Sequence, residues 1–226
     1  MTSDPQYEYS PITETNGIRL IALRPSQDAS TPLHCSLIHK KLSLCGDGDI
    51  FGHYIALSYA WGNPEKSKTI LVNGRQLGIT SNLYSALLDL REEKRTLMIW
   101  ADGACINQRD NTEKAIEIGL MGQIYSSAPH TVIYLGPSES TGAESMCLAA
   151  IRNGGYVVLD ENLGSVFMRE WLTRVWVFQE FIFSRNLWLQ CGRTRLRWDL
   201  LLDIIGSKGL RLDVAQTSGK ESTDRI

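Results

Sequence analysis

A glutamate inside an otherwise apolar stretch is the most informative single residue of the sequence. Glu180 stands within Trp171–Phe181, a segment rich in tryptophan and large apolar side chains. If its carboxyl group faces a partly buried cleft, desolvation raises its pKa and favours an acid–base or cation-stabilising role. The alternatives are an ion pair with Arg174 or Arg185, or exposure to solvent at the outer edge of a helix.

A second cluster, Leu57–Gly62, ends a short apolar run. The hydroxyl of Ser58 and the rings of Tyr59 and Trp61 can hold a flat ligand ring and hydrogen-bond a ribose or a phosphate. Ligands of open α/β sheets bind beyond the carboxyl ends of strands, which is where this cluster is expected. The alternative is a buried aromatic strand that ends in a turn glycine.

A third cluster follows the predicted strand Leu97–Ala101. Asp102 is well placed to bind ribose hydroxyls, and it is equally suited to an Asx turn. Asn107 and Asp110 are expected to brace the loop. Cys105 suits a small buried thiol better than a nucleophile that uses a distant histidine as its base.

Several common sites are absent from the sequence. It contains neither of the glycine-rich phosphate-binding motifs, GxGxxG and GxxxxGK[ST], and no GxSxG element of serine hydrolases. Its four histidines have no ligand-like spacing, so we expect no metal site. Segments 124–128 and 132–136 are interpreted as a helix end and sheet core, without a functional role.

Composition narrows the class of protein further. The 226 residues include 23 basic and 25 acidic side chains, which argues against a nucleic-acid partner. Five cysteines without a CxxC pair suit reduced thiols. No apolar run is long enough to cross a membrane, and the polar, acidic N-terminus resembles no targeting peptide. These features predict a soluble cytoplasmic protein without a membrane partner.

Strands and helices alternate along the predicted core. Strands are expected at 17–25, 33–44, 54–60, 97–101, 131–135 and 187–191, with hairpins at 69–80, around Asn73-Gly74, and 187–197. Helices are expected after a cap at Ser81 or Asn82, after a cap at Thr112, and at 143–151, 166–183 and 198–205. The stripes predicted for the first two helices are Leu83, Leu87 and Leu90, and Ile118, Met121 and Tyr125. This alternation predicts a parallel sheet flanked by helices.

Five ordered motifs resemble the fungal heterokaryon incompatibility (HET) domain. They are LSYAWG at 57–62, NL..ALLDLR at 82–91, W.D..CINQRD..EK at 100–114, LM..IYSSA..V.YLG at 120–136 and R.W..QE at 174–180. A Cys-Gly pair and a following tryptophan, Cys191, Gly192 and Trp198, complete the set. The sequence departs from the family pattern at Ala101 and Gly103, usually larger and apolar, and at Glu117, where glutamine is commoner.

HET domains resemble TIR domains, which cleave the nicotinamide–ribose bond of NAD with a glutamate. The resemblance implies an α/β fold of TIR-like (flavodoxin-like) type, with a mostly parallel sheet, an added β-hairpin and N-terminal strands. It implies Glu180 as the catalytic residue. The residues implied to bind substrate are Ser58, Tyr59, Trp61, Asp102 and Trp176. NAD is the substrate, and no separate cofactor is implied.

The resemblance also implies a biological role and a domain division. The expected role is an effector of incompatibility or programmed cell death that hydrolyses NAD as a homo-oligomer. The alternatives are a non-enzymatic module that self-assembles and signals through protein partners of an immune pathway, and a hydrolase dependent on Cys105. The predicted division is an N-terminal extension with strands packing on the core (1–53), the HET domain (54–206) and a polar tail (207–226).

Overall fold

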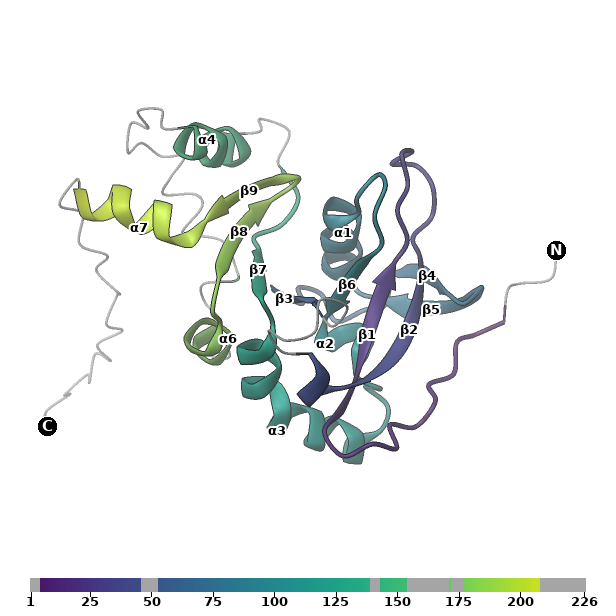
Figure 1. Ribbon diagram of the computed structural model, residues 1–226. Helices are drawn as coiled ribbons and strands as arrows, with labels where there is room; N and C mark the ends of the chain where they lie inside the picture. The colour runs from purple at the N-terminus through teal and green to yellow at the C-terminus, as the bar shows by residue number, and fades with distance from the viewer. Residues whose placement is uncertain (1–4, 46–52, 139–142, 154–170, 172–176, 208–226) are drawn as a thin grey trace, which may run out of the picture.

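The computed structural model describes residues 5–45, 53–138, 143–153, 171 and 177–207 (Figure 1). Within them, one nine-stranded sheet has the order β5-β4-β2-β1-β6-β3-β7-β8-β9. Its strands are β1 (Gly17–Leu23), β2 (His34–Lys41), β3 (Ile55–Tyr59), β4 (Lys68–Val72), β5 (Arg75–Ile79), β6 (Leu97–Trp100), β7 (His130–Tyr134), β8 (Leu187–Cys191) and β9 (Thr194–Arg197).

The sheet is mixed, whereas the sequence predicted a mostly parallel one. Strands β6, β3, β7 and β8 are neighbours and run parallel, as do β2 and β4. The other neighbours are antiparallel, including β1 with both β2 and β6. Strands joined by a short turn must reverse direction, and the β4–β5 turn does so with Asn73 and Gly74 at φ 51° and 79°. The hairpins predicted at 69–80 and 187–197 are confirmed.

Helices pack on both sides of the central strands. They are α1 (Ser81–Leu90), α2 (Asp102–Cys105), α3 (Asn111–Ser127), α4 (Ala143–Arg152), α6 (Val177–Phe183) and α7 (Trp198–Ser207), with a 3₁₀ turn, η1, at Leu42–Leu44. In the view of Figure 1, α1 lies above β3 and β6, and α3 and α6 lie below them. Of the predicted helix 166–183, residues 166–170 and 172–176 lie outside the described part of the chain.

Two helices begin at residues other than the predicted caps. The Thr80 side chain, rather than Ser81 or Asn82, caps α1 by accepting a hydrogen bond from the Leu83 amide. Asp110, rather than Thr112, caps α3 and accepts hydrogen bonds from the amides of Thr112 and Glu113. In both cases an earlier residue in extended conformation carries the acceptor, as an N-cap requires.

Helix α3 buries a different stripe from the predicted one. The predicted Met121 and Tyr125 are buried, but Ile118 is 39% exposed. The buried residues of α3 are Glu117, Leu120, Met121, Ile124 and Tyr125. The prediction therefore missed a buried carboxylic acid, because glutamate is rarely placed in a core. The predicted α1 stripe of Leu83, Leu87 and Leu90 is buried.

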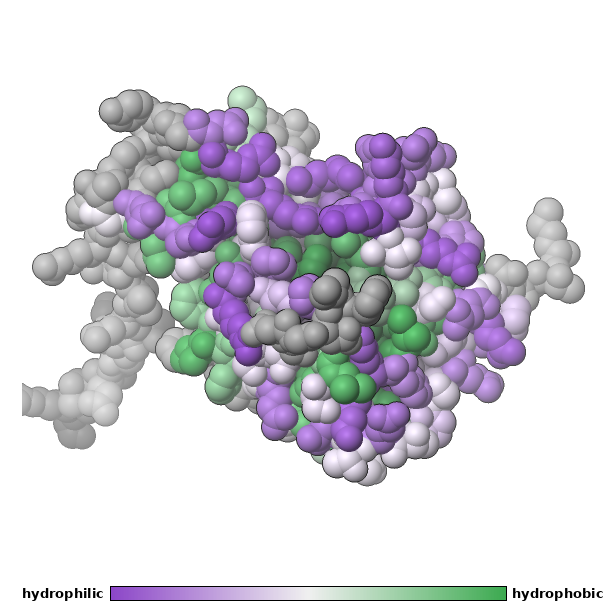
Figure 2. All heavy atoms as spheres, viewed as in Figure 1, coloured by the Kyte–Doolittle hydropathy of each residue, from purple (hydrophilic) through white to green (hydrophobic). Residues whose placement is uncertain are grey.

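Apolar side chains form two clusters along the sheet. The larger packs α1, α2 and α3 against β1 to β7, and the smaller packs α4 and α7 against β7, β8 and β9. Figure 2 shows the face of the molecule that is turned to the viewer in Figure 1. Polar residues cover most of its described surface, and apolar residues lie beside α4 and α7. The four described cysteines, Cys35, Cys45, Cys105 and Cys191, are buried. No helix among the described residues has the length and hydrophobicity needed to cross a bilayer.

Candidate functional site

A cavity of about 310 Å³ opens at the carboxyl ends of the parallel strands β3 and β6. This volume lies at the lower end of the range of small-molecule sites. Its lining residues are Trp61, Asp102, Ile106, Gln108, Lys114, Ile118, Met121 and Glu180. Three residues predicted from the sequence, Trp61, Asp102 and Glu180, therefore meet at one cavity.

Trp61 and Asp102 come from neighbouring strand ends and are joined to each other. The indole Nε1 of Trp61 donates to Oδ2 of Asp102 at 2.8 Å. The other carboxylate oxygen of Asp102 accepts from the amide of Gly103 at 2.7 Å. The carboxylate thus orients the indole and binds the amide of the next residue, rather than the amide two residues on that an Asx turn requires.

Glu180 enters the cavity from α6 and is held from behind. Only 4% of it is exposed, so the alternative of a solvent-exposed glutamate is wrong. The hydroxyl of Ser58 donates to Oε2 of Glu180, and the indole Nε1 of Trp171 donates to that hydroxyl at 2.5 Å. Because the carboxylate is fixed by a buried hydrogen-bonded pair, it is already oriented before any ligand arrives. Arg174 lies outside the described residues.

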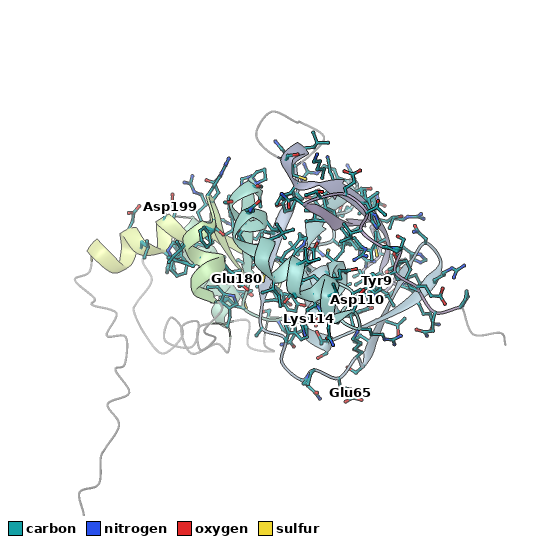
Figure 3. All side chains as sticks on the ribbon, turned by 90° about the horizontal axis from the view of Figure 1, so that it is seen from below. Tyr9, Glu65, Asp110, Lys114, Glu180 and Asp199 are labelled. Atoms are coloured by element: carbon teal, nitrogen blue, oxygen red, sulfur yellow. The ribbon has the colours of Figure 1, made fainter. Side chains whose placement is uncertain are left out.

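The remaining walls come from α3 and the segment that precedes it. Lys114 and Met121 lie on α3, which packs against α6 (Figure 3). The side chain of Gln108 lines the cavity and donates to the carbonyl of Asp102 at 2.8 Å. None of these residues was predicted from the sequence as a site residue, although Lys114 is the last residue of the CINQRD..EK motif. That motif was the only signal that could have identified it.

The other predicted site residues stand elsewhere. Ser58 and Tyr59 are buried in β3 and do not line the cavity. The side chain of Tyr59 covers Gly103, where an added Cβ would lie 2.4 Å from its hydroxyl oxygen. The small residue at position 103 is therefore matched to Tyr59 in this chain. Trp176 lies outside the described residues.

Cys105 is a buried residue of α2 and does not line the cavity. Burial raises the pKa of its thiol to about 12. At neutral pH almost none of the reactive thiolate is present, which disfavours Cys105 as a nucleophile. Asn107 and Asp110 brace the loop as expected, since Asn107 accepts from the Arg109 amide and Asp110 caps α3.

Several other motif residues hold the framework of the site. The side-chain amide of Asn82 donates to the Ala60 carbonyl at 3.1 Å and fixes the backbone just before Trp61. Gly62, just after Trp61, has a φ of 62°. The buried Arg91 donates to four carbonyls of the 28–32 loop. These hydrogen bonds hold the end of the sheet at which the cavity lies.

The arrangement suits a polar ligand with a flat cationic ring. Two carboxylates, Asp102 and Glu180, can accept hydrogen bonds from hydroxyl groups, while Trp61 offers an aromatic face and Lys114 a positive charge. Among the described residues no group of histidine, cysteine or acidic side chains has the geometry of a metal site.

The motifs that build this cavity are also those that relate the chain to known proteins. Residues 54–180 match the heterokaryon incompatibility protein (HET) family. The chain is 37% identical over 134 residues to heterokaryon incompatibility protein 6, OR allele, of Neurospora crassa, an alignment that covers 54% of this chain and 19% of that protein. No solved structure matches the chain significantly. This chain belongs to the heterokaryon incompatibility (HET) family.

Proposed function

We propose that this HET domain hydrolyses NAD at the nicotinamide–ribose bond as the effector of an incompatibility or cell-death response. The observation that carries the proposal is the buried carboxylate of Glu180, oriented by Ser58 and facing a cavity that also contains Trp61 and Asp102. The chain spans about a fifth of the length of its Neurospora relative, so the activity of a whole protein is part of the proposal.

The cavity chemistry matches the reacting half of NAD. The pyridinium ring of nicotinamide is cationic and is attracted to the face of an indole, here that of Trp61. The ribose hydroxyls donate hydrogen bonds to the carboxylates of Asp102 and Glu180. Lys114 supplies a positive charge for the diphosphate.

The reaction needs little acid catalysis, since nicotinamide leaves as a neutral molecule. The bond between the ribose anomeric carbon and the pyridinium nitrogen breaks, and its electron pair goes to nicotinamide. Glu180 stabilises the positive charge that develops on the ribose, as a carboxylate does in glycoside hydrolysis. Water then attacks the anomeric carbon and releases a proton to solvent, giving ADP-ribose.

The order of the central strands supports a distant relationship to TIR domains. Numbered in chain order, the parallel strands β3, β6, β7 and β8 have the spatial order 2-1-3-4. This is the beginning of the flavodoxin-like order, in which ligands bind beyond the carboxyl ends of the strands. We therefore propose a TIR-like core at 54–206, to which β1, β2 and the β4–β5 hairpin are added.

The test is the release of nicotinamide from NAD by the purified full chain at high concentration with a crowding agent. We expect Glu180→Gln to lower the rate at least about 100-fold. Glu93→Gln changes the same charge at an exposed position and is expected to keep full activity. Thermal melting checks that Glu180→Gln remains folded. No release by the wild type, or full activity of Glu180→Gln, would contradict the proposal.

Ser58→Ala separates positioning from substrate binding. Since Ser58 lies behind Glu180 and outside the cavity, its loss is expected to lower kcat about tenfold while KM changes less than about twofold. A rise in KM with unchanged kcat would instead assign Ser58 to substrate binding. Ser126→Ala removes an exposed hydroxyl that neither lines the cavity nor binds a residue lining it, and it serves as the matched control.

A second candidate is a signalling module that acts through self-assembly. It is favoured by Ile182 and Phe183, which are 60% and 45% exposed on α6, beside Glu180. Cell-death assays distinguish the two. Toxicity that survives Glu180→Gln but disappears in Ile182→Asp selects the signalling module, and the reverse result selects the hydrolase.

A further inference from the structure

A second and larger cavity lies on the other side of α3. Its volume is about 510 Å³, and it is enclosed by the segment 9–17, the start of β1 and the first three turns of α3. In Figure 3, Tyr9 and Asp110 lie near the start of α3, while Lys114 lies farther along α3 and Glu180 lies on α6. The proposed NAD site uses none of the residues that line this second cavity.

The lining is acidic and only partly neutralised. It contains four carboxyl groups, those of Glu14, Asp110, Glu113 and Glu117, but only one cationic side chain, Arg19. Arg19 already donates to both carboxylate oxygens of Glu113, at 2.5 and 2.9 Å. The positive charge of Arg19 is therefore largely neutralised by Glu113, and the other three carboxyl groups have no cationic side chain among the lining residues.

Glu117 is the residue that indicates a missing partner. It is 1% exposed, it lines the cavity, and its Oε2 is buried without a hydrogen-bond partner among the described residues. A buried carboxyl oxygen left unpaired is costly, and a ligand that donates a hydrogen bond removes that cost. Burial raises the pKa of Glu117 to about 7, with a smaller contribution from Glu113. A bound cation favours the ionised carboxylate and forms an ion pair with it.

Two features favour an organic cation over a metal ion. No group of ligating side chains with metal geometry occurs in the described part of the chain. The cavity is far larger than an ion needs, and part of its wall is apolar, formed by Pro11, Ile12, Ile116 and Leu120. A charged head group with a short aliphatic chain matches both the acidic and the apolar surface.

We propose that this cavity is a binding site for a small alkyl ammonium or alkyl guanidinium compound, whose cationic group donates to Glu117. The aliphatic chain then lies against Ile12 and Ile116, and Thr112 and Glu14 lie at the rim of the acidic surface. This proposal does not rest on NAD hydrolysis, because the two cavities share no lining residue and binding is measured without NAD.

The test is a two-dimensional NMR titration of the full chain with n-butylammonium and n-butylguanidinium, with n-butanol as the neutral probe. We expect saturable shifts of the 113–120 amides, with a Kd of about 1 mM for the better cation and at least tenfold weaker binding of n-butanol. Affinity is expected to rise between pH 6 and 8 as Glu117 ionises. The better of the two cations identifies the head group. Non-saturable shifts, shifts spread over acidic surfaces, or equal binding of n-butanol would overturn the proposal.

Two variants locate the site. Glu117→Gln keeps the shape but removes the charge, and it is expected to weaken binding at least tenfold, whereas the exposed Glu93→Gln has no effect. Ile116→Lys, at a residue 60% exposed, places a competing ammonium in the cavity and is expected to weaken binding similarly without disturbing the core. Unchanged affinity in either variant would reject the site.

Discussion

The two buried glutamates of the described core differ in how their carboxyl groups are satisfied. Glu180 accepts a hydrogen bond from Ser58, itself held by Trp171. Glu117 has an unpartnered Oε2 and the like charge of Glu113 nearby, while the nearest cation, Arg19, pairs with Glu113. The carboxylate of Glu180 is therefore oriented by its hydrogen bond at one cavity, whereas burial at the other cavity disfavours the ionised form of Glu117.

Glu117 makes the stability of the protein depend on pH. Its folded-state pKa, raised to about 7, lies above the value of about 4.3 for an unfolded chain, so its contribution to stability is fully present below pH 4.3 and is lost as the pH rises through 7. We expect the free energy of unfolding of the wild type, relative to Glu117→Gln, to fall by about 2.5 kcal/mol between pH 5 and pH 8. Urea unfolding of both proteins at the two pH values measures this difference.

The groups around Glu117 decide how that comparison is interpreted. The other titratable or charged side chains near it are Arg19, Glu113, Asp110, Glu14, Tyr9 and Cys105. They are present in both proteins, so their own titration largely cancels in the difference. A constant difference across the pH range would show that Glu117 titrates normally.

At the residue scale, part of the cavity could be predicted from sequence. Trp61 and Asp102 follow strands, and Glu180 is a lone carboxylate in an apolar run, so local sequence singles them out. Ser58 and Tyr59 carry the same signal, but neither lines the cavity, because Ser58 lies behind Glu180 and Tyr59 packs over Gly103. Lys114 and Met121 could not be found locally, since the rotation of α3 against α6 is set by packing.

At the scale of elements, the start of α3 is fixed by Asp110 and not by Thr112. We expect Asp110→Ala to cost about 1 kcal/mol of stability, because two backbone amides lose their acceptor, and Thr112→Ala to cost less than about 0.5 kcal/mol. Urea unfolding of the two variants measures both costs. Equal losses would mean that the first turn is held by other contacts, such as the bond from the Asn107 amide to Glu113.

The sequence predicted the strands and hairpins that have a local signal, but it did not predict which distant strands pair with one another. Asn73-Gly74 specifies a hairpin by its own backbone preference, and each central strand is an apolar run. That β1 pairs with β6, nearly 80 residues later in the chain, has no local signature. That pairing is antiparallel, as are the β1–β2, β4–β5 and β8–β9 pairs, so the predicted parallel sheet describes only the central strands.

At the scale of the whole molecule, β1 joins the two parts of the sheet. It lies between β2 and β6, and its side chains are almost all buried. Arg19 of this strand, fully buried, also pairs with Glu113 of α3. Arg91, the residue that follows α1, donates hydrogen bonds to carbonyl groups of the loop that connects β1 with β2. The described residues 5–45 are therefore bound to the rest of the fold at several places, these three contacts among them.

These contacts argue that residues 54–226 do not fold without the preceding segment. Removal of β1 takes Ile18, Leu20, Ile21 and Leu23 from the core, and burial of four such side chains contributes about 6–12 kcal/mol. This loss is comparable to the whole stability of a typical domain, about 5–15 kcal/mol. It also leaves β6 as an open edge and Glu113 without its arginine.

We expect 54–226 to show no cooperative thermal transition, while 5–226, which keeps every described residue, melts like the full chain. A cooperative transition of 54–226 near that of the full chain would instead establish the boundary at residue 54 that the sequence motifs predict.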